Sequence, residues 1–318
     1  MGKNIRLGLV GAGHWGKRLI KTISALEGVS LDVVASKNPN TTNLVPEARV
    51  VSNWKELLKA SLDGVCIAVP PTYHAQMLQA FLNVGIPVMV EKPLCLSLRE
   101  ADKLCDLVGN SPAPILVDHT QLFQPAYQVL KKCVKRFGSP RFIRSEGMAL
   151  GPFRPDVSVL WDWSCHDIAL CLDLMGRLPE RVSAVGGDYA VEMMLTFGGG
   201  VVAAISNSNL SLTKRRLFEV YCGHRALVFN DCLKTKLLEY KIDFNSRVVH
   251  VPRNPSGTAI AIAKEAPLAR VLKHFAEGIR RRDFARFNFG LACNVVRVLD
   301  AAERSIKKGV ALSVTKPR

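Results

Sequence analysis

The sequence predicts an α/β protein with two domains: a doubly wound parallel sheet (residues 1–120), then an α/β domain with an open, largely antiparallel sheet (residues 121–318). Three observations predict this architecture. The chain has 318 residues, a length that suits two hydrophobic cores. Short apolar runs alternate with amphipathic stretches over the first 120 residues, a pattern typical of strand–helix–strand units. Beyond residue 120, strand-like runs follow one another between Gly, Asn and Ser turns.

Periodicity places the elements of the first domain. The apolar run at residues 5–10 predicts the first strand, and Leu19, Ile20 and Ile23 stand at helical spacing in a helix predicted over residues 17–26. The segment Ser97-Leu98-Arg99-Glu100 matches a capping box and marks another helix start. The remaining predicted strands are residues 31–35, 64–69, 87–90 and 115–117, and the remaining predicted helices are residues 54–60, 74–84 and 97–108.

The second domain begins with a predicted helix over residues 125–137, and another is predicted over residues 164–175. Two further helices, residues 268–282 and 291–307, close the chain. A sheet with one face not covered by its own helices suits an oligomer interface. The strand-like runs of this sheet include residues 193–197, 201–206, 218–222 and 248–251.

Composition excludes several classes of protein. The chain is 48% apolar with a mean hydropathy of +0.13, which is typical of globular proteins. No apolar run approaches the roughly 18 residues of a membrane helix, and no signal peptide is recognisable, so we expect a cytoplasmic protein and no membrane partner. The nine cysteines form no C-x-x-C pair and no zinc-type spacing, so we expect reduced thiols and no metal site.

Positive charge is concentrated in the second domain. The net charge is +16, of which residues 1–118 contribute +2 and residues 119–318 contribute +14. The basic clusters are short and no nucleic-acid module is recognisable, so we expect no nucleic-acid partner. Attraction of an anionic small substrate, or solubility, accounts for the charge better.

A glycine-rich segment directly follows the first strand. Gly11, Gly13 and Gly16 form G-x-G-x-x-G, with His14 and Trp15 before the last glycine. These glycines permit a tight turn, close approach of a pyrophosphate and close helix packing, while the helix N-terminus supplies amide donors. A turn that only needs glycines is the alternative. Because a strand and a helix flank the loop where they should, the segment predicts a Rossmann NAD(P)-binding domain with these five residues at the cofactor.

The end of the second strand indicates which dinucleotide binds. An NAD site usually presents Asp or Glu there to the ribose hydroxyl, whereas this chain has Ser36 followed by Lys37. A hydroxyl and a cation suit a 2'-phosphate. We therefore expect NADP(H) to be favoured over NAD(H), with a solvated loop lysine as the alternative interpretation of Lys37.

A charged pair follows a later strand. Val88-Met89-Val90 leads into Glu91-Lys92-Pro93, at the carboxyl edge where open α/β sheets bind ligands. Upstream, the run 64–69 leads into Pro70, and His74 opens the next helix. With the glycine loop, the crossover from His119 to Pro125 and the segment Asp162-Trp163-Ser164-Cys165-His166-Asp167, these motifs strongly resemble the Gfo/Idh/MocA family over nearly the whole chain.

The resemblance implies a Rossmann domain, an open-sheet second domain, an NAD or NADP cofactor, and oxidation or reduction of a sugar-type carbinol or ketone. It also implies a homodimer or homotetramer formed through the open sheet. Lys92 matches the family's active-site lysine, and Asp162 and His166 match its D-x-x-x-H pair. A cis Lys92–Pro93 bond is common at this motif, although most X–Pro bonds are trans. Pro70, His74, Glu91 and Lys92 are expected beside the cofactor.

Hydride transfer at a carbinol requires a group that takes or gives the hydroxyl proton. We expect His166 in that role, Lys92 polarising the substrate oxygen and sharing the proton role, and Asp162 orienting a substrate hydroxyl. Asp162 and His166 are four residues apart and share a face if the helix begins by Asp162. A structural histidine and a helix-capping aspartate are the alternatives for the pair.

Two further residues are candidates for substrate binding. Arg154 could clamp a carboxylate or phosphate, although a loop arginine is as good an interpretation, and His119 follows a strand on the cofactor side. We expect an oxidoreductase acting on a sugar or sugar derivative, with an anionic nucleotide sugar as one option. Two alternatives stay open: an NAD-dependent glycoside-cleaving enzyme, and a non-catalytic cofactor-sensing regulator, which would have no need of Lys92, Asp162 and His166.

Overall fold

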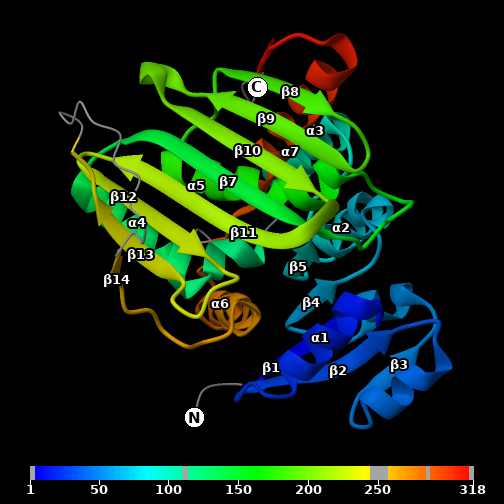
Figure 1. Ribbon diagram of the computed structural model, residues 1–318. Coiled ribbons are helices and arrows are strands. Elements are labelled where there is room, and N and C mark those ends of the chain that lie inside the picture. The colour runs from blue at the N-terminus through cyan, green and yellow to red at the C-terminus, as the bar shows by residue number, and fades with distance from the viewer. Residues whose placement is uncertain (1–3, 110–113, 244–256, 284–286, 315–318) are drawn as a thin grey trace. The chain divides into compact units, whose positions relative to one another are not determined.

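A computed structural model describes residues 4–109, 114–243, 257–283 and 287–314 of the chain (Figure 1). The backbone packs as two compact units. The first unit comprises Met1–Phe123 and Glu265–Val296, and the second comprises Gln124–Lys264 and Arg297–Arg318. The strand predicted at residues 248–251 lies outside the described residues.

The first unit is built on a parallel sheet of six strands in the order β3-β2-β1-β4-β5-β6. The chain enters the sheet at its middle and winds outward in both directions, so the expected doubly wound architecture is confirmed. The strand order reverses beside β1, and ligands of such sheets bind at the carboxyl ends of the strands near that point. The strands are β1 (Ile5–Val10), β2 (Val29–Ala35), β3 (Arg49–Val51), β4 (Gly64–Ile67), β5 (Val88–Glu91) and β6 (Ile115–Asp118).

Helices cover this sheet. The apolar residues of β1 pack in one buried cluster with Leu19 and Ile23 of α1 and with Leu272 and Phe275 of α6, while α2 packs on β5 and on α3. The α-helices with residues in this unit are α1 (His14–Ile23), α2 (His74–Asn83), α3 (Leu98–Gly109), α6 (Pro267–Arg281) and the first part of α7 (Phe289–Lys308).

Two predicted helices differ from those observed. α1 begins three residues before the predicted start, because Gly13 serves as the N-cap and the third glycine of the loop lies inside the helix. The predicted helix at residues 54–60 is a 3-10 helix, Trp54–Lys59. The short 3-10 helices are η1 (Pro39–Leu44), η2 (Trp54–Lys59), η3 (Pro71–Tyr73), η4 (Thr120–Phe123) and η6 (Gly198–Gly200).

The second unit contains a nine-stranded sheet in the order β14-β13-β12-β11-β7-β10-β9-β8-β15. β7 and β10 run parallel, and the other described strand pairs are antiparallel, which confirms the largely antiparallel sheet. The strands are β7 (Pro140–Leu150), β8 (Arg181–Gly186), β9 (Ala190–Thr196), β10 (Val202–Ser208), β11 (Leu210–Cys222), β12 (Arg225–Asn230), β13 (Leu237–Lys241), β14 (Thr258–Ala259) and β15 (Leu312–Ser313).

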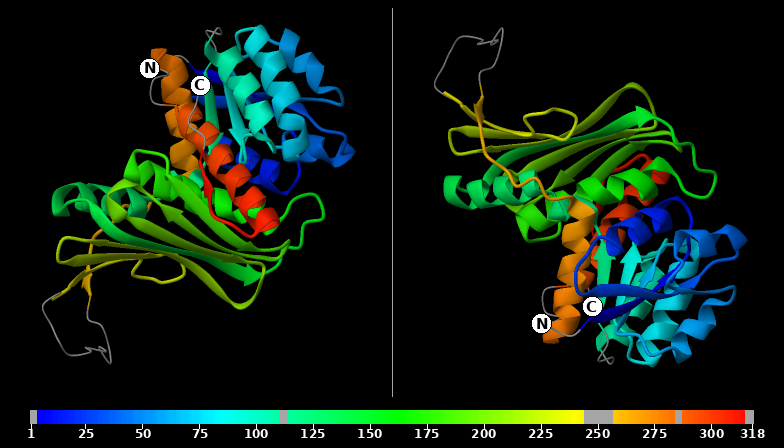
Figure 2. Two further views of the ribbon diagram at one scale, coloured as in Figure 1. Left: turned by 90° about the horizontal axis from the view of Figure 1, so that it is seen from above. Right: turned by 90° about the horizontal axis from the view of Figure 1, so that it is seen from below.

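One face of this sheet is covered and the other is open. α4 (Pro125–Phe137) and α5 (Cys165–Met175) pack on the same side of the strands (Figure 2). Along β9 and β10, residues that face the helices are buried and alternate with residues that do not, as the two-residue repeat of a strand requires. The exposed apolar side chains of the strands include Leu212, which is 89% exposed, and Val185, which is 62% exposed.

No helix in the described ranges is long and apolar enough to cross a membrane. All nine cysteines lie in the described part of the chain, and none of them forms a disulfide bond there.

Candidate functional site

The glycine loop follows β1 without a break. Gly11 has a φ of +97°, and a Cβ there would lie 2.4 Å from the Ala68 carbonyl oxygen, so no other residue fits. A Cβ on Gly16 would lie 2.1 Å from the Gly11 carbonyl oxygen, which shows how closely α1 packs on the loop. A Cβ on Gly13 would meet no atom within 4 Å. The first and third glycines therefore serve the protein's own packing, whereas the second borders open space.

The N-terminus of α1 fits the pyrophosphate of a dinucleotide. Gly13, the N-cap, offers no side chain to the first N–H groups of the helix, and its first turn holds no acidic residue. Unsatisfied N–H groups and the positive end of the helix dipole favour an anion here. His14 is exposed in the first turn, and Trp15 is half-buried, with the Arg18 guanidinium 4.9 Å from its ring centroid.

The residues after β2 present a hydroxyl and a cation. Ser36 Oγ accepts hydrogen bonds from the Thr41 hydroxyl (2.8 Å) and the Asn38 backbone N–H (3.1 Å), so its own proton can be donated to a ligand. Lys37 is exposed. Asp32, the acidic residue of β2, is held by Arg6 at 2.6 Å and lies before the end of the strand. No carboxylate therefore stands at the end of β2 where NAD sites usually present one.

His74 joins two loops at this edge of the sheet. Its Nδ1 lies 2.9 Å from the Pro93 carbonyl oxygen, and its Nε2 lies 3.0 Å from that of Val69. Burial lowers the pKa of this imidazole, although the carbonyl contacts oppose that shift. The side chain thus ties Val69, before Pro70, to the Lys92–Pro93 turn, whose peptide bond is cis as the resemblance implied.

A cluster of ionisable residues occupies the ends of β5 and β6. Register pairs Glu91 with Asp118, and Lys92 and His119 are the residues that follow them. Glu91 is 9% exposed and Asp118 is fully buried, while Lys92 is partly exposed. The structure therefore brings Lys92, Glu91 and His119 to the edge that carries the glycine loop. The sequence analysis missed Asp118, although an acidic residue directly after the predicted strand 115–117 was a signal that could have found it.

Burial controls protonation in this cluster. It raises the pKa of Glu91 and of Asp118, and it is the main cause that lowers the pKa of His119 to about 3, with the Lys92 charge contributing. His119 is therefore neutral over the physiological range. Both its ring nitrogens are buried without a hydrogen-bond partner. Because such orphaned groups are costly, the imidazole is suited to a ligand.

In the second unit, Asp162 and His166 lie on one continuous helical segment. A π-helical turn, η5 (Leu160–Ser164), runs directly into α5, so Asp162 lies in the π turn and His166 in the first turn of the α-helix. Such π turns occur frequently at functional sites. Asp162 is 8% exposed and His166 is partly exposed. The sequence analysis placed the helix start at residue 164 and missed the π turn, which periodicity does not reveal.

Arg154 is a partner of Asp162. Its Nη1 donates to Asp162 at 3.1 Å, while its Nε and Nη2 donate to Asp156 at 3.1 and 2.6 Å. The contact with Arg154 is the main cause that lowers the pKa of Asp156. Three of the five donors of this guanidinium are thus already engaged by carboxylates, and the rest are left for a ligand.

A buried network behind His166 supports α5. Asp167 accepts hydrogen bonds of 2.6 Å each from Ser145 of β7 and Asn207 of β10, and burial raises its pKa. The sequence analysis missed this network because its members come from three separate elements. Among the described residues, no group of three His, Cys, Asp or Glu side chains is placed to hold a metal ion.

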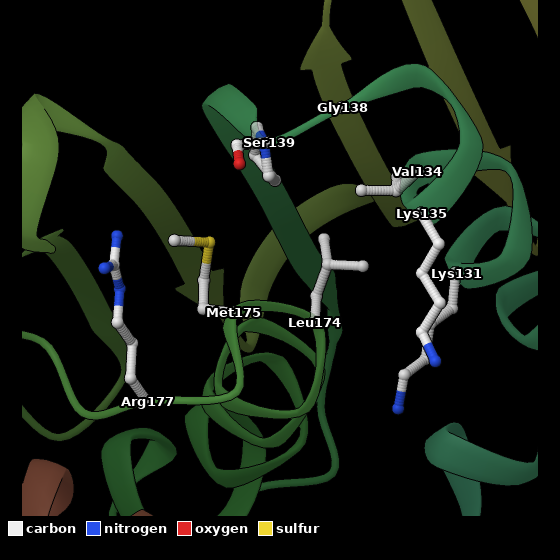
Figure 3. Close-up of a pocket in the computed structure, with 9 residues that line it drawn as sticks. Lys131, Val134, Lys135, Gly138, Ser139, Leu174, Met175 and Arg177 are labelled. Carbon is white, nitrogen blue, oxygen red and sulfur yellow. The ribbon is translucent and has the colours of Figure 1, made fainter.

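A groove of about 410 Å³ in the second unit contains none of the predicted site residues (Figure 3). Lys131 and Lys135 project from α4 on one side, and Arg177 lies on the other beyond Leu174 and Met175 (Figure 3). Lys131 pairs with Asp173 at 2.7 Å, and Arg177 donates to the Gly198 carbonyl at 2.6 Å. Lys135 in the last turn of α4 and Arg177 just after α5 lie near helix C-termini, where a cation offsets the helix dipole.

Comparisons with known proteins agree with the fold and the loop. Residues 5–119 match the model of the Gfo/Idh/MocA family, described as an oxidoreductase family with an NAD-binding Rossmann fold. A UDP-N-acetylglucosamine 3-dehydrogenase of Acidithiobacillus ferrooxidans is 27% identical over 87% of this chain and 89% of its own. An inositol 2-dehydrogenase of Rhizobium meliloti is 26% identical over 64% of this chain and 68% of its own.

A solved structure extends the similarity to both units. It is the crystal structure of a protein classed as an oxidoreductase from Magnetospirillum magnetotacticum MS-1, with 36% identity and a TM-score of 0.85. The match covers 93% of this chain and 99% of that one. The chain therefore belongs to the Gfo/Idh/MocA family of nicotinamide-dependent oxidoreductases.

Proposed function

We propose that the protein is an NADP(H)-preferring dehydrogenase that interconverts a hydroxyl and a ketone on a sugar or sugar derivative, with a nucleotide sugar as the favoured class. The observation that carries the proposal is the carboxyl edge of the first-unit sheet, which holds the glycine loop and Lys92 together. The substrate class follows from the relative that spans most of the chain, whose name specifies a UDP-sugar. The surplus of positive charge in residues 119–318 supports an anionic substrate.

The preference for NADP(H) depends on the end of β2. Ser36 is already oriented by two hydrogen bonds and has a proton to donate, and exposed Lys37 supplies a positive charge beside it. A 2'-phosphate would gain charge-assisted hydrogen bonds from both. Asp32 does not compete for a ribose hydroxyl, because Ser30 and Arg6 bind its two oxygens.

Lys92 is proposed to polarise the substrate oxygen. Lys92 follows Glu91, the last residue of β5. The contact of His74 with the Pro93 carbonyl oxygen fixes the turn that carries Lys92. The nicotinamide, when bound, accepts or supplies the hydride. A fixed cation favours the negative charge that develops on the substrate oxygen during oxidation.

His166 is proposed to take or give the hydroxyl proton, and Asp162 to orient a substrate hydroxyl. His166 is partly exposed in the first turn of α5, whereas its neighbour Asp167 is buried and bound to Ser145 and Asn207. Asp167 thereby anchors the turn that carries the imidazole. Asp162 is held by Arg154, so its carboxylate is oriented before a substrate arrives.

We also propose roles for two ligand-binding residues. His119, neutral and without partners for its ring nitrogens, would exchange hydrogen bonds with a ligand. Arg154 would use its remaining donors on an anionic substrate group while holding Asp162.

The open sheet of the second unit is proposed to pair with a second copy of the chain. Its exposed apolar residues would be costly on a monomer, and an aligned second sheet would bury them. They lie on four strands or beside them: Leu150, Val185, Met194, Leu210 and Leu212. Light scattering during size-exclusion chromatography would measure the mass of a dimer or tetramer formed in this way. The cytoplasm is the proposed compartment, because none of the nine cysteines forms a disulfide bond.

The test of the function has two steps. Fluorescence titrations with NADPH and NADH come first, and we expect the smaller Kd for NADPH. The better oxidised cofactor is then incubated with UDP-N-acetylglucosamine, other UDP-sugars, free hexoses and myo-inositol, and reduction is followed by absorbance. Turnover of a UDP-sugar supports the proposal, turnover of only an uncharged polyol assigns a different substrate, and binding of neither cofactor by folded protein refutes the proposed function.

A further inference from the structure

Two buried carboxyl groups meet side by side on neighbouring strands. Glu91 ends β5 and Asp118 ends β6, and the parallel register pairs the two residues directly. Their side chains are close enough to interact, and this interaction raises the pKa of Glu91 and lowers that of Asp118. Two carboxylates are both acceptors, so a hydrogen bond between them requires one proton.

The other partners of the pair are all donors. The Thr120 hydroxyl donates to Asp118 Oδ1 at 2.7 Å, and the Lys92 backbone N–H donates to the Glu91 carboxyl. Glu91 Oε1 and Asp118 Oδ2 are buried and receive no hydrogen bond from a donor group of the protein. One proton between these two oxygens would satisfy both atoms.

The surroundings fix the charge that this pair can carry. Lys92 is the cation beside the pair, and the indole N–H of Trp15 is buried without a hydrogen-bond partner. Cys66 of β4 is a neutral thiol, because burial and the two carboxyls raise its pKa, and His119 is neutral. A second negative charge would be buried beside the first, whereas the positive charge of Lys92 lowers the pKa of both carboxyls and so favours one ionised group in the pair.

We propose that Glu91 and Asp118 share a single proton and act as one singly charged positioning unit for Lys92. The unit holds the backbone of Lys92 through the N–H bond to Glu91, and its single negative charge favours the ammonium form of the Lys92 side chain. Neither carboxyl contacts the reacting atoms in this role. The inference adds to the proposed function, which assigns Lys92 to the substrate oxygen, but the existence of the shared proton does not depend on that assignment.

Infrared spectroscopy of the full chain tests the shared proton directly. At pH 7 we expect the carbonyl band of a protonated carboxylic acid, which shifts on transfer to D₂O. Asp118→Asn and Glu91→Gln should each abolish this band, because an amide donates the hydrogen bond and leaves the other group ionised. Asp167 is also buried with a raised pKa, so its contribution is subtracted with Asp167→Asn. The exposed Glu56→Gln variant is the matched control and should keep the band.

The charge is tested by ¹³C NMR of reductively methylated protein, with the Lys92 signal assigned by its loss in Lys92→Arg. Asp118→Asn keeps one negative charge in the pair, whereas the double variant Glu91→Gln/Asp118→Asn removes it. We expect the double variant to lower the pKa of Lys92 by about one unit or more, and the single variant to lower it much less.

Each outcome decides the question. A wild-type band that survives in both single variants, or a wild-type spectrum with no band beyond that of Asp167, overturns the shared proton. A Lys92 pKa that is the same in the folded double variant and the wild type overturns the positioning role. Failure of every sugar to react leaves both readouts intact, so loss of the proposed function is distinguished from loss of the carboxyl pair. Circular dichroism confirms that each variant is folded.

Discussion

Two alanine substitutions in the glycine loop separate packing from ligand binding. Gly13→Ala places a methyl group where no protein atom lies within 4 Å, and the backbone of Gly13 (φ −70°, ψ −161°) is open to any residue. Alanine lowers the conformational entropy of the unfolded chain, which stabilises the folded protein by about 0.4–1 kcal/mol. Alanine is also a poorer N-cap than glycine, which destabilises the helix by a similar amount. We therefore expect the Tm to stay within about 3 °C of the wild type.

The same methyl group occupies the space that a pyrophosphate needs. Losing one charge-assisted hydrogen bond of about 1.5–3 kcal/mol raises the Kd of NADPH by roughly 10- to 150-fold. Gly16→Ala is the matched comparison: its Cβ would lie 2.1 Å from the Gly11 carbonyl oxygen, so backbone must move and both Tm and affinity fall. Fluorescence titration and thermal denaturation of the variants measure these effects. Wild-type affinity in Gly13→Ala would show that the loop is not a pyrophosphate cradle.

Four further predictions follow from single side chains. Lys37→Glu should reverse the cofactor preference, measured as the ratio of the Kd values for NADPH and NADH; an unchanged ratio contradicts the 2'-phosphate site. Lys92→Met should abolish turnover while cofactor affinity is retained, and unchanged turnover removes this lysine from the mechanism. Leu212→Glu should reduce the mass measured by light scattering to that of a smaller assembly; an unaltered mass places the interface elsewhere. Because burial raises the pKa of Asp118 above its unfolded value, the folded chain holds a proton that the unfolded chain releases above about pH 4. The free energy of unfolding should therefore fall as pH rises from that point, by up to about 1.4 kcal/mol per pH unit for this proton. Urea unfolding at several pH values should show a less steep fall for the Asp118→Asn variant than for the wild type. Equal slopes for the two proteins contradict this prediction.

Local patterns were enough to predict the glycine loop of the first unit and the strand and helix that flank it. The strand, glycine loop and helix at its N-terminus are adjacent in sequence, so the chemistry of Gly11, Gly13 and Gly16 can be read without knowing what packs against them. The start of α1 was missed by three residues because a glycine is a poor helix former, yet Gly16 lies inside the helix, where it lets α1 approach the loop.

The central strand of the second unit escaped prediction for a physical reason. β7 contains Arg144, Ser145, Glu146 and Gly147, a run that lacks the apolar alternation of a half-buried strand. Ser145 is buried because it bonds to Asp167, and a Cβ on Gly147 would lie within 3.0 Å of Asp167 and Asn207. Polar and small residues are selected there by partners on other elements, which a pattern along one strand cannot show.

The two acidic groups of the candidate site also depend on partners that a pattern along one segment cannot show. Asp162 was identified from the resemblance of Asp162 and His166 to the D-x-x-x-H pair of the family, but its ion pair with Arg154 depends on the loop before η5 folding back onto the π turn. In the proposed role, a substrate hydroxyl that donates a hydrogen bond to Asp162 would share this carboxylate with the Arg154 guanidinium, which already holds it in place. Glu91 is the opposite case, because its acidic partner Asp118 supplies no positive charge and burial raises the pKa of both. The carboxylate paired with arginine is held in place to orient a ligand, whereas the two paired carboxyls are proposed to share a proton, and the proposed division of roles between the two units follows from that difference.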